Sequence, residues 1–166
     1  MIDEELRGTA QRVLVQCRAQ GLRVATAESC TGGLVAGALT EIAGSSDVVD
    51  CGFVTYSNEA KQALLGVPAA TLKRYGAVSE ETAAAMAAGA LKHSRADLSV
   101  AITGIAGPGG GTKDKPVGLV HFAAASRDGR RLARVRHFGK LGRRRVRLRS
   151  VVQALELYLA LLAQDS

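Results

Sequence analysis

The hydrophobic and polar positions of this sequence follow two different periods along the chain. From Asp3 to Gln20 the apolar residues recur at the spacing of an amphipathic helix, and Gly21 is placed to end it. From Val48 to Tyr56 β-branched and aromatic residues predominate, as is typical of a strand. The same criteria predict helices near 3–20, 32–43, 59–65, 79–94 and 144–163, and strands near 22–27, 48–56, 98–103, 117–125 and 132–138.

The order of these elements indicates the fold class. Helices alternate with strands over the first two-thirds of the chain, and Asp128-Gly129 is a strong hairpin signal between the last two strands. We therefore expect an α/β fold with a mixed sheet, and the length of 166 residues is that of a single domain spanning 1–166. Ligands of such folds bind beyond the carboxyl ends of the strands.

The composition is that of a globular protein, with 47% apolar and 22% charged residues. The apolar stretch from Leu155 to Ala163 contains Glu156 and is too short to span a membrane. The start of the chain, Met1 to Leu6, is acidic, so we expect no signal peptide and a cytoplasmic location. The three cysteines form no CxxC pair and the three histidines are widely separated, which predicts reduced thiols and no metal.

The net charge of +7 is concentrated in one segment. Residues 127–149 hold eleven of the 22 Lys and Arg residues and one acid, so this segment carries +10 and the remainder −3. One interpretation is a surface that binds phosphate, on a small ligand or on nucleic acid; the other is a solvated hairpin and helix start. Phe138 is the segment's only aromatic residue, which argues against a nucleic-acid surface that stacks bases.

The first strand end with candidate chemistry runs from Thr26 to Gly33. A hydroxyl between a strand and a helix can lie near unpaired backbone N–H groups, so Ser29 is a candidate nucleophile; alternatively, Ser29 or Thr31 only caps the next helix. Cys30 is either a rival nucleophile or a buried structural thiol. Glu28 could orient a neighbour or pair with a base.

The second strand end places Tyr56 and Lys61 at the start of a predicted helix. A lysine in the first turn of a helix lies against the positive end of the helix dipole, which lowers its pKa. Such a lysine can act as a general base for a serine, and Tyr56 could relay a proton or hold the lysine. The alternative is a solvated lysine and a tyrosine at the sheet edge.

The third strand end is a loop with five glycines between Gly104 and Gly111. Glycines let a ligand approach backbone N–H groups closely, as in phosphate-binding loops. The order Gly111-Thr112-Lys113 does not match a Walker A loop, nor does the loop match the dinucleotide-binding fingerprint. A flexible lid or a plain surface loop is the alternative.

Together these blocks resemble the CinA C-terminal domain family, whose free-standing members are nicotinamide-nucleotide amidases. The similar motifs lie between about residues 5 and 160, in 27–33, 42–46, 52–61, 76–79 and 103–110. The resemblance implies a three-layer α/β/α fold with a mixed, mostly parallel sheet. It also implies hydrolysis of nicotinamide mononucleotide to nicotinic acid mononucleotide and ammonia, without cofactor or metal, by a homodimer or larger homo-oligomer.

By this resemblance Ser29 is the nucleophile, Lys61 the general base and Tyr56 the residue that assists them. The implied substrate-binding residues are Cys30, Thr31, Gly32, Gly33, Ser46, Thr103, Gly104, Gly107, Gly109 and Arg144. Before the last helix the family pattern Phe-x-Gly-Asp-Arg is altered here, because the Asp is missing and one residue is added. The family's Arg could therefore correspond to Arg143, Arg144 or Arg145, whereas Val146-Arg147 matches.

These observations predict an amidohydrolase that acts on nicotinamide mononucleotide through Ser29 and Lys61. Two alternatives remain open. The chain could be a non-catalytic nucleotide-binding module, in which the glycine loop and the arginine-rich segment hold a phosphorylated ligand. The +10 segment could instead contact nucleic acid in a role related to competence or DNA damage, in which case binding would weaken steeply with salt.

Overall fold

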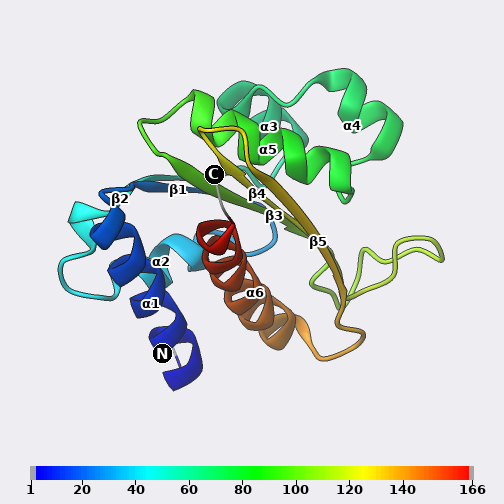
Figure 1. Ribbon diagram of the computed structural model, residues 1–166. Helices are drawn as coiled ribbons and strands as arrows, with labels where there is room; N and C mark the ends of the chain where they lie inside the picture. Colours follow the sequence, from blue (N-terminus) through cyan, green and yellow to red (C-terminus); the bar gives the residue numbers. More distant parts are fainter. Residues whose placement is uncertain (1–2, 165–166) are drawn as a thin grey trace.

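One five-stranded sheet organises the chain in the computed structural model, which describes residues 3–164 (Figure 1). The strand order is β2-β1-β3-β4-β5. The pairs β1–β2 and β1–β3 are parallel, whereas β3–β4 and β4–β5 are antiparallel, so only β4 runs against the other four. The strands are β1 Val24–Glu28, β2 Val49–Val54, β3 Leu98–Gly104, β4 Leu119–Ser126 and β5 Arg131–His137. The predicted mixed, mostly parallel sheet is confirmed.

Helices cover both faces of this sheet and make three layers (Figure 1). One face carries α1 Glu4–Gln20, α2 Leu34–Thr40 and α6 Arg143–Ala163. The other carries α3 Asn58–Leu65, α4 Ala69–Tyr75 and α5 Glu80–Lys92. Among residues 3–164 no helix is both long and apolar enough to cross a membrane.

The two faces of the sheet differ in the size of their side chains. Successive residues of a strand point to opposite faces, so β3 directs Val100 and Ile102 towards the α1–α6 layer and Ala101 towards α5. Alanines of β1 and β4 share the α5 face, which lets the alanine-rich α5 approach the sheet closely. At Gly89 of α5 a Cβ atom would overlap the Leu65 carbonyl, so the end of α3 packs directly against the α5 backbone at this glycine.

Most predicted helix boundaries are confirmed within a few residues. Ser57 accepts a hydrogen bond from the Ala60 N–H and caps α3, and Ser79 caps α5 in the same way. Gly21 ends α1 at a φ of 65°. The short helix α4 was not predicted, and a 3-10 turn at Ser45–Asp47 precedes β2. Met1 and Ile2, which belong to the acidic start of the chain, lie outside the described residues.

Candidate active site

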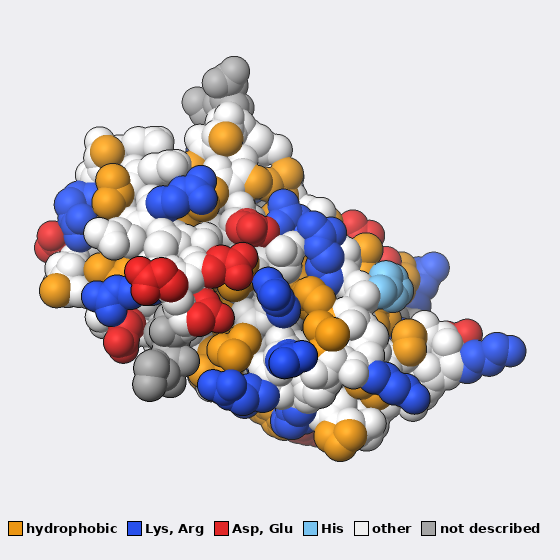
Figure 2. Space-filling view, turned by 90° about the horizontal axis from the view of Figure 1, so that it is seen from below, with side chains coloured by type: hydrophobic (Ala, Val, Ile, Leu, Met, Phe, Trp, Pro, Cys, Tyr) orange, Lys and Arg blue, Asp and Glu red, His pale blue; other side chains and the backbone are white. Residues whose placement is uncertain are grey.

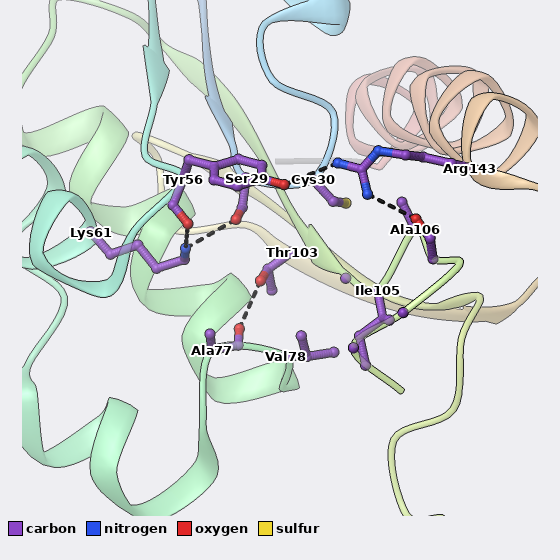
Figure 3. Close-up of a pocket in the computed structure, with 14 residues that line it drawn as sticks. Ser29, Cys30, Tyr56, Lys61, Ala77, Val78, Thr103, Ile105, Ala106 and Arg143 are labelled. Carbon is purple, nitrogen blue, oxygen red and sulfur yellow. Dashed lines mark hydrogen bonds between the residues drawn. The ribbon is translucent and has the colours of Figure 1, made fainter. Parts of the chain in front are cut away.

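The carboxyl ends of β1, β2 and β3 surround a cavity of about 270 Å³. The sequence predicted ligand binding at these strand ends, and the cavity brings all three together. The predicted site residues that line it are Ser29, Cys30, Tyr56, Lys61, Thr103, Gly104, Gly107 and Gly109. Lys61 and Arg143 reach towards the cavity from opposite sides (Figure 3).

The centre of the cavity is a contact between Lys61 and Ser29. The Lys61 Nζ donates to Ser29 Oγ at 3.0 Å, to the Thr55 carbonyl at 2.9 Å and to the Tyr56 carbonyl at 3.4 Å (Figure 3). Three acceptors therefore match the three protons of an ammonium group. A neutral amine could still donate to both carbonyls while its lone pair accepts the Ser29 proton.

Burial gives Lys61 the properties of a base. Its side chain is 1% exposed, and burial lowers its pKa, an effect that the charge of a Cys30 thiolate would oppose. No acidic side chain among residues 3–164 forms an ion pair with it. The sequence predicted a lowered pKa from the helix dipole, and the structure identifies burial as a cause.

A tight turn after β1 presents Ser29. The Ser29 N–H donates to the Ile102 carbonyl at 2.9 Å, and the Gly32 N–H donates to the Ser29 carbonyl at 3.0 Å. Glu28 receives the N–H groups of Val35 at 2.8 Å and Ala36 at 3.1 Å. Its carboxylate therefore holds the start of α2 and does not pair with Lys61, which decides between its two predicted roles.

Cys30 lines the cavity, but its thiol is not an activated nucleophile. Burial raises its pKa to about 12, and the nearby Glu28 charge adds to this, while its own backbone hydrogen bond, Arg147 and Lys61 oppose it. The thiol therefore stays protonated at neutral pH. Of the two nucleophiles that the sequence offered, the geometry favours Ser29.

Tyr56 contributes to the pair through its backbone rather than its ring. Its carbonyl accepts from Lys61, whereas its side chain is 63% exposed and its hydroxyl accepts from Arg143 at 3.0 Å. The second Arg143 nitrogen donates to the Gly107 carbonyl at 2.8 Å. Arg143 thus connects the Tyr56 side of the cavity with the glycine loop.

The glycine loop and the α4–α5 connection form the remaining walls. Thr103 is buried, and its hydroxyl donates to the Ala77 carbonyl at 2.7 Å (Figure 3). Lys115, at the far end of the loop, donates to the Tyr75 carbonyl at 2.6 Å. These two contacts attach the loop and β3 to the α4–α5 connection, so neither wall is an isolated surface loop.

Several predicted site residues lie away from the cavity. Ser46 is exposed in the turn that leads into the beginning of β2, at the opposite edge of the sheet from the strand ends. Thr31, Gly32 and Gly33 lie in the turn behind Ser29 and do not line the cavity, and Gly33 is the N-cap residue of α2.

Of the three arginines among which the sequence left the choice open, Arg143 lines the cavity and Arg144 does not. Arg144 lines a separate surface hollow with Arg145 and Arg149, and Arg143 occupies the cavity instead. Successive helical residues are about 100° apart around the axis, so at most one of three consecutive arginines can point into the same cavity. The family resemblance alone did not fix this rotation.

Arg147 is a residue at this site to which the sequence assigned no role. Its guanidinium donates to the Cys30 carbonyl at 3.1 Å and to the Thr31 carbonyl at 3.2 Å. The sequence could have indicated this residue, because Arg143 and Arg147 are four residues apart and therefore share one face of α6. Among residues 3–164 no three His, Cys, Asp or Glu side chains gather in a way that could hold a metal ion.

A serine and a buried lysine, between a glycine loop and an arginine, define a hydrolase-type site on an α/β fold. Residues 6–162 match the model of the CinA C-terminal domain, and the chain belongs to this family. The predicted family membership is confirmed.

Named relatives share most of this length. The nicotinamide-nucleotide amidohydrolase PncC of Enterobacter agglomerans is 48% identical over 156 residues, covering 94% of both chains. The protein of the same name from Escherichia coli K12 is 53% identical over 134 residues, covering 81% of both. A crystal structure titled competence/damage inducible protein CihA, from Agrobacterium tumefaciens, has a TM-score of 0.96 at 55% identity, covering 97% of this chain and 98% of its own.

Proposed function

We propose that this protein is a nicotinamide-nucleotide amidohydrolase, which converts nicotinamide mononucleotide and water to nicotinic acid mononucleotide and ammonia. The observation that carries the proposal is the 3.0 Å contact between the Lys61 amine and Ser29 Oγ in a cavity at the strand ends. The two PncC relatives, at 48% and 53% identity over most of the chain, support the same activity.

The chemistry follows from the surroundings of the two side chains. Neutral Lys61 takes the Ser29 proton as Oγ attacks the carboxamide carbon, and the oxyanion that forms is held by N–H groups of the turn after Ser29. Lys61 then gives the proton to the leaving nitrogen as the C–N bond breaks. Water attacks the acyl-enzyme with Lys61 again as base, and this releases the carboxylate product.

Arg143 supplies the contact for the substrate phosphate. Its guanidinium lies at the cavity with only neutral oxygens as partners, the Gly107 carbonyl and the Tyr56 hydroxyl. Because guanidinium pairs strongly with phosphate, a nucleotide would exchange neutral contacts for charged ones. We further propose that the active form is a homodimer or larger homo-oligomer in the cytoplasm, as the family resemblance implies.

The activity is tested by ammonia release from the purified chain with nicotinamide mononucleotide, nicotinamide riboside and nicotinamide. We expect turnover of the mononucleotide and weaker turnover of the riboside, which lacks the phosphate that Arg143 binds. We expect none of the free base, which lacks both the phosphate and the ribose. A Ser29→Ala preparation measures the background from contaminating amidases. Equal rates for wild type and Ser29→Ala, or binding of the mononucleotide without ammonia release, would contradict the proposal.

A further inference from the structure

The turn that carries Ser29 is held from behind by one side chain of another layer. Arg147 of α6 reaches the Cys30 carbonyl at 3.1 Å and the Thr31 carbonyl at 3.2 Å, across more than a hundred residues of sequence. Its guanidinium lies so close that a Cβ atom at Gly32 would be 3.3 Å from Nη2, where Gly32 has a φ of +59°. The turn and the arginine are therefore packed as one unit.

The two contacts fix the direction of two peptide groups. In a planar trans peptide the carbonyl and the following N–H point in opposite directions. Since the Cys30 carbonyl faces Arg147, the Thr31 N–H points away from α6. The Thr31 carbonyl also faces Arg147, and the Gly32 N–H of that peptide closes the turn on the Ser29 carbonyl at 3.0 Å.

Ser29 is fixed by the same turn. Its N–H donates to the Ile102 carbonyl of β3 at 2.9 Å, and its carbonyl accepts from the Gly32 N–H at 3.0 Å. The shape of the turn therefore decides whether Ser29 Oγ lies within reach of the Lys61 amine, which is 3.0 Å away. No acidic side chain in the described part of the chain forms an ion pair with Arg147, so its positive charge acts on the turn without a counter-ion.

We propose that Arg147 is a positioning residue for the reaction, which holds the Cys30–Gly32 turn so that Ser29 Oγ stays within reach of the Lys61 amine. The inference rests on the proposed amidase function and adds to it a residue that touches neither substrate nor Ser29. The guanidinium holds the carbonyls of two consecutive residues of the turn, and these follow Ser29 directly.

The test compares Arg147→Ala and Arg147→Lys with Arg145→Ala, an exposed arginine of the same helix, as control. Ammonia release from nicotinamide mononucleotide should show kcat reduced about 10- to 100-fold in Arg147→Ala, with KM changed less than about threefold, because a displaced nucleophile slows the chemical step more than substrate binding. Arg147→Lys, which keeps the charge, should retain more activity. Millimolar guanidinium chloride should partly restore kcat in Arg147→Ala and leave the control unchanged.

A second readout separates this inference from the proposed function. A fluorophosphonate probe phosphonylates Ser29 by forming an Oγ–P bond as fluoride leaves and Lys61 takes the proton, so its labelling rate reports how well Ser29 is placed for attack. Slower labelling in Arg147→Ala than in the wild type supports the positioning role. Equal labelling rates, or a kcat loss that neither lysine nor guanidinium reverses, would overturn it. Absent ammonia release and absent labelling in the wild type would overturn the proposed function as well.

Discussion

Lys61 is 1% exposed and meets a serine hydroxyl and two carbonyls, whereas six of the ten arginines between residues 127 and 149 donate to carbonyls of the protein's own backbone. Arg127 donates to the carbonyls of Leu91, Ser94 and Ala96. Arg130 donates to those of Leu161 and Gln164. The environment of Lys61 is thus suited to chemistry, while many of the eleven Lys and Arg residues between 127 and 149 support the fold.

The arginines of the +10 segment fall into those that contact other parts of the fold and those that lie at the site. Of the hairpin arginines, Arg134 and Arg136 contact Gln153 of α6. On the face seen in Figure 2, acidic side chains gather beside basic ones. Arg149 pairs with Glu5 at 3.5 Å. Only Arg143 lines the cavity, and Arg147 lies behind it. A dense run of charge therefore says less about function than a single charge whose partners are all neutral.

The largest effect on activity is expected from substitutions that break the Ser29–Lys61 pair. Ser29→Ala and Lys61→Met should each lower kcat for ammonia release by about a thousandfold or more, and the double variant should be little worse, because attack and proton removal act as one unit. In the wild type kcat/KM should rise with pH and level off below pH 10.5, since burial lowers the Lys61 pKa from that value. Lys73→Met, on the exposed face of α4, is the matched control; losses that multiply in the double variant would contradict a shared step.

An intermediate effect distinguishes the neighbouring arginines at the start of α6. Arg143→Ala should raise KM for nicotinamide mononucleotide about 10- to 100-fold, because a charged contact to phosphate is worth about 1.5–3 kcal/mol. Arg144→Ala should change it less than about twofold, since Arg144 lines a different hollow. Turnover of the riboside, which has no phosphate, should be nearly insensitive to both. A larger effect of Arg144→Ala would return the phosphate contact to the residue that the family resemblance favoured.

The sequence predicted those features that short stretches of chain determine. Ser57, Ser79 and Gly21 mark helix ends by their own hydrogen bonds and backbone angles, so these boundaries could be predicted locally. Helix α4 was missed because Pro68 gives it no side-chain cap and Leu72 is its only buried residue. Its position depends on packing against α5, which no local pattern reveals.

The site was predicted where its residues follow strand ends and missed where it depends on the rotation of a helix. Ser29 and Lys61 are 32 positions apart, yet the rule that strand ends share one edge brings them together. The choice of Arg143 over Arg144 depends on where α6 begins, and Gly142 precedes it at a φ of 93° without a side-chain cap. That backbone angle is set by the tertiary structure and cannot be predicted from the residue types.

The smallest expected effect concerns an arginine that supports the fold. Arg127→Ala should lower the free energy of unfolding by about 1–2 kcal/mol in urea titrations, because four hydrogen bonds to the end of α5 and the chain beyond it are lost. KM for the mononucleotide should stay unchanged, since none of those acceptors lines the cavity. Arg145→Ala, which removes the same charge without breaking a described contact, should leave the free energy within about 0.5 kcal/mol of wild type. If Arg127→Ala instead raised KM without changing stability, the hairpin arginines would belong to the binding surface, and the contrast between the two regions would fail.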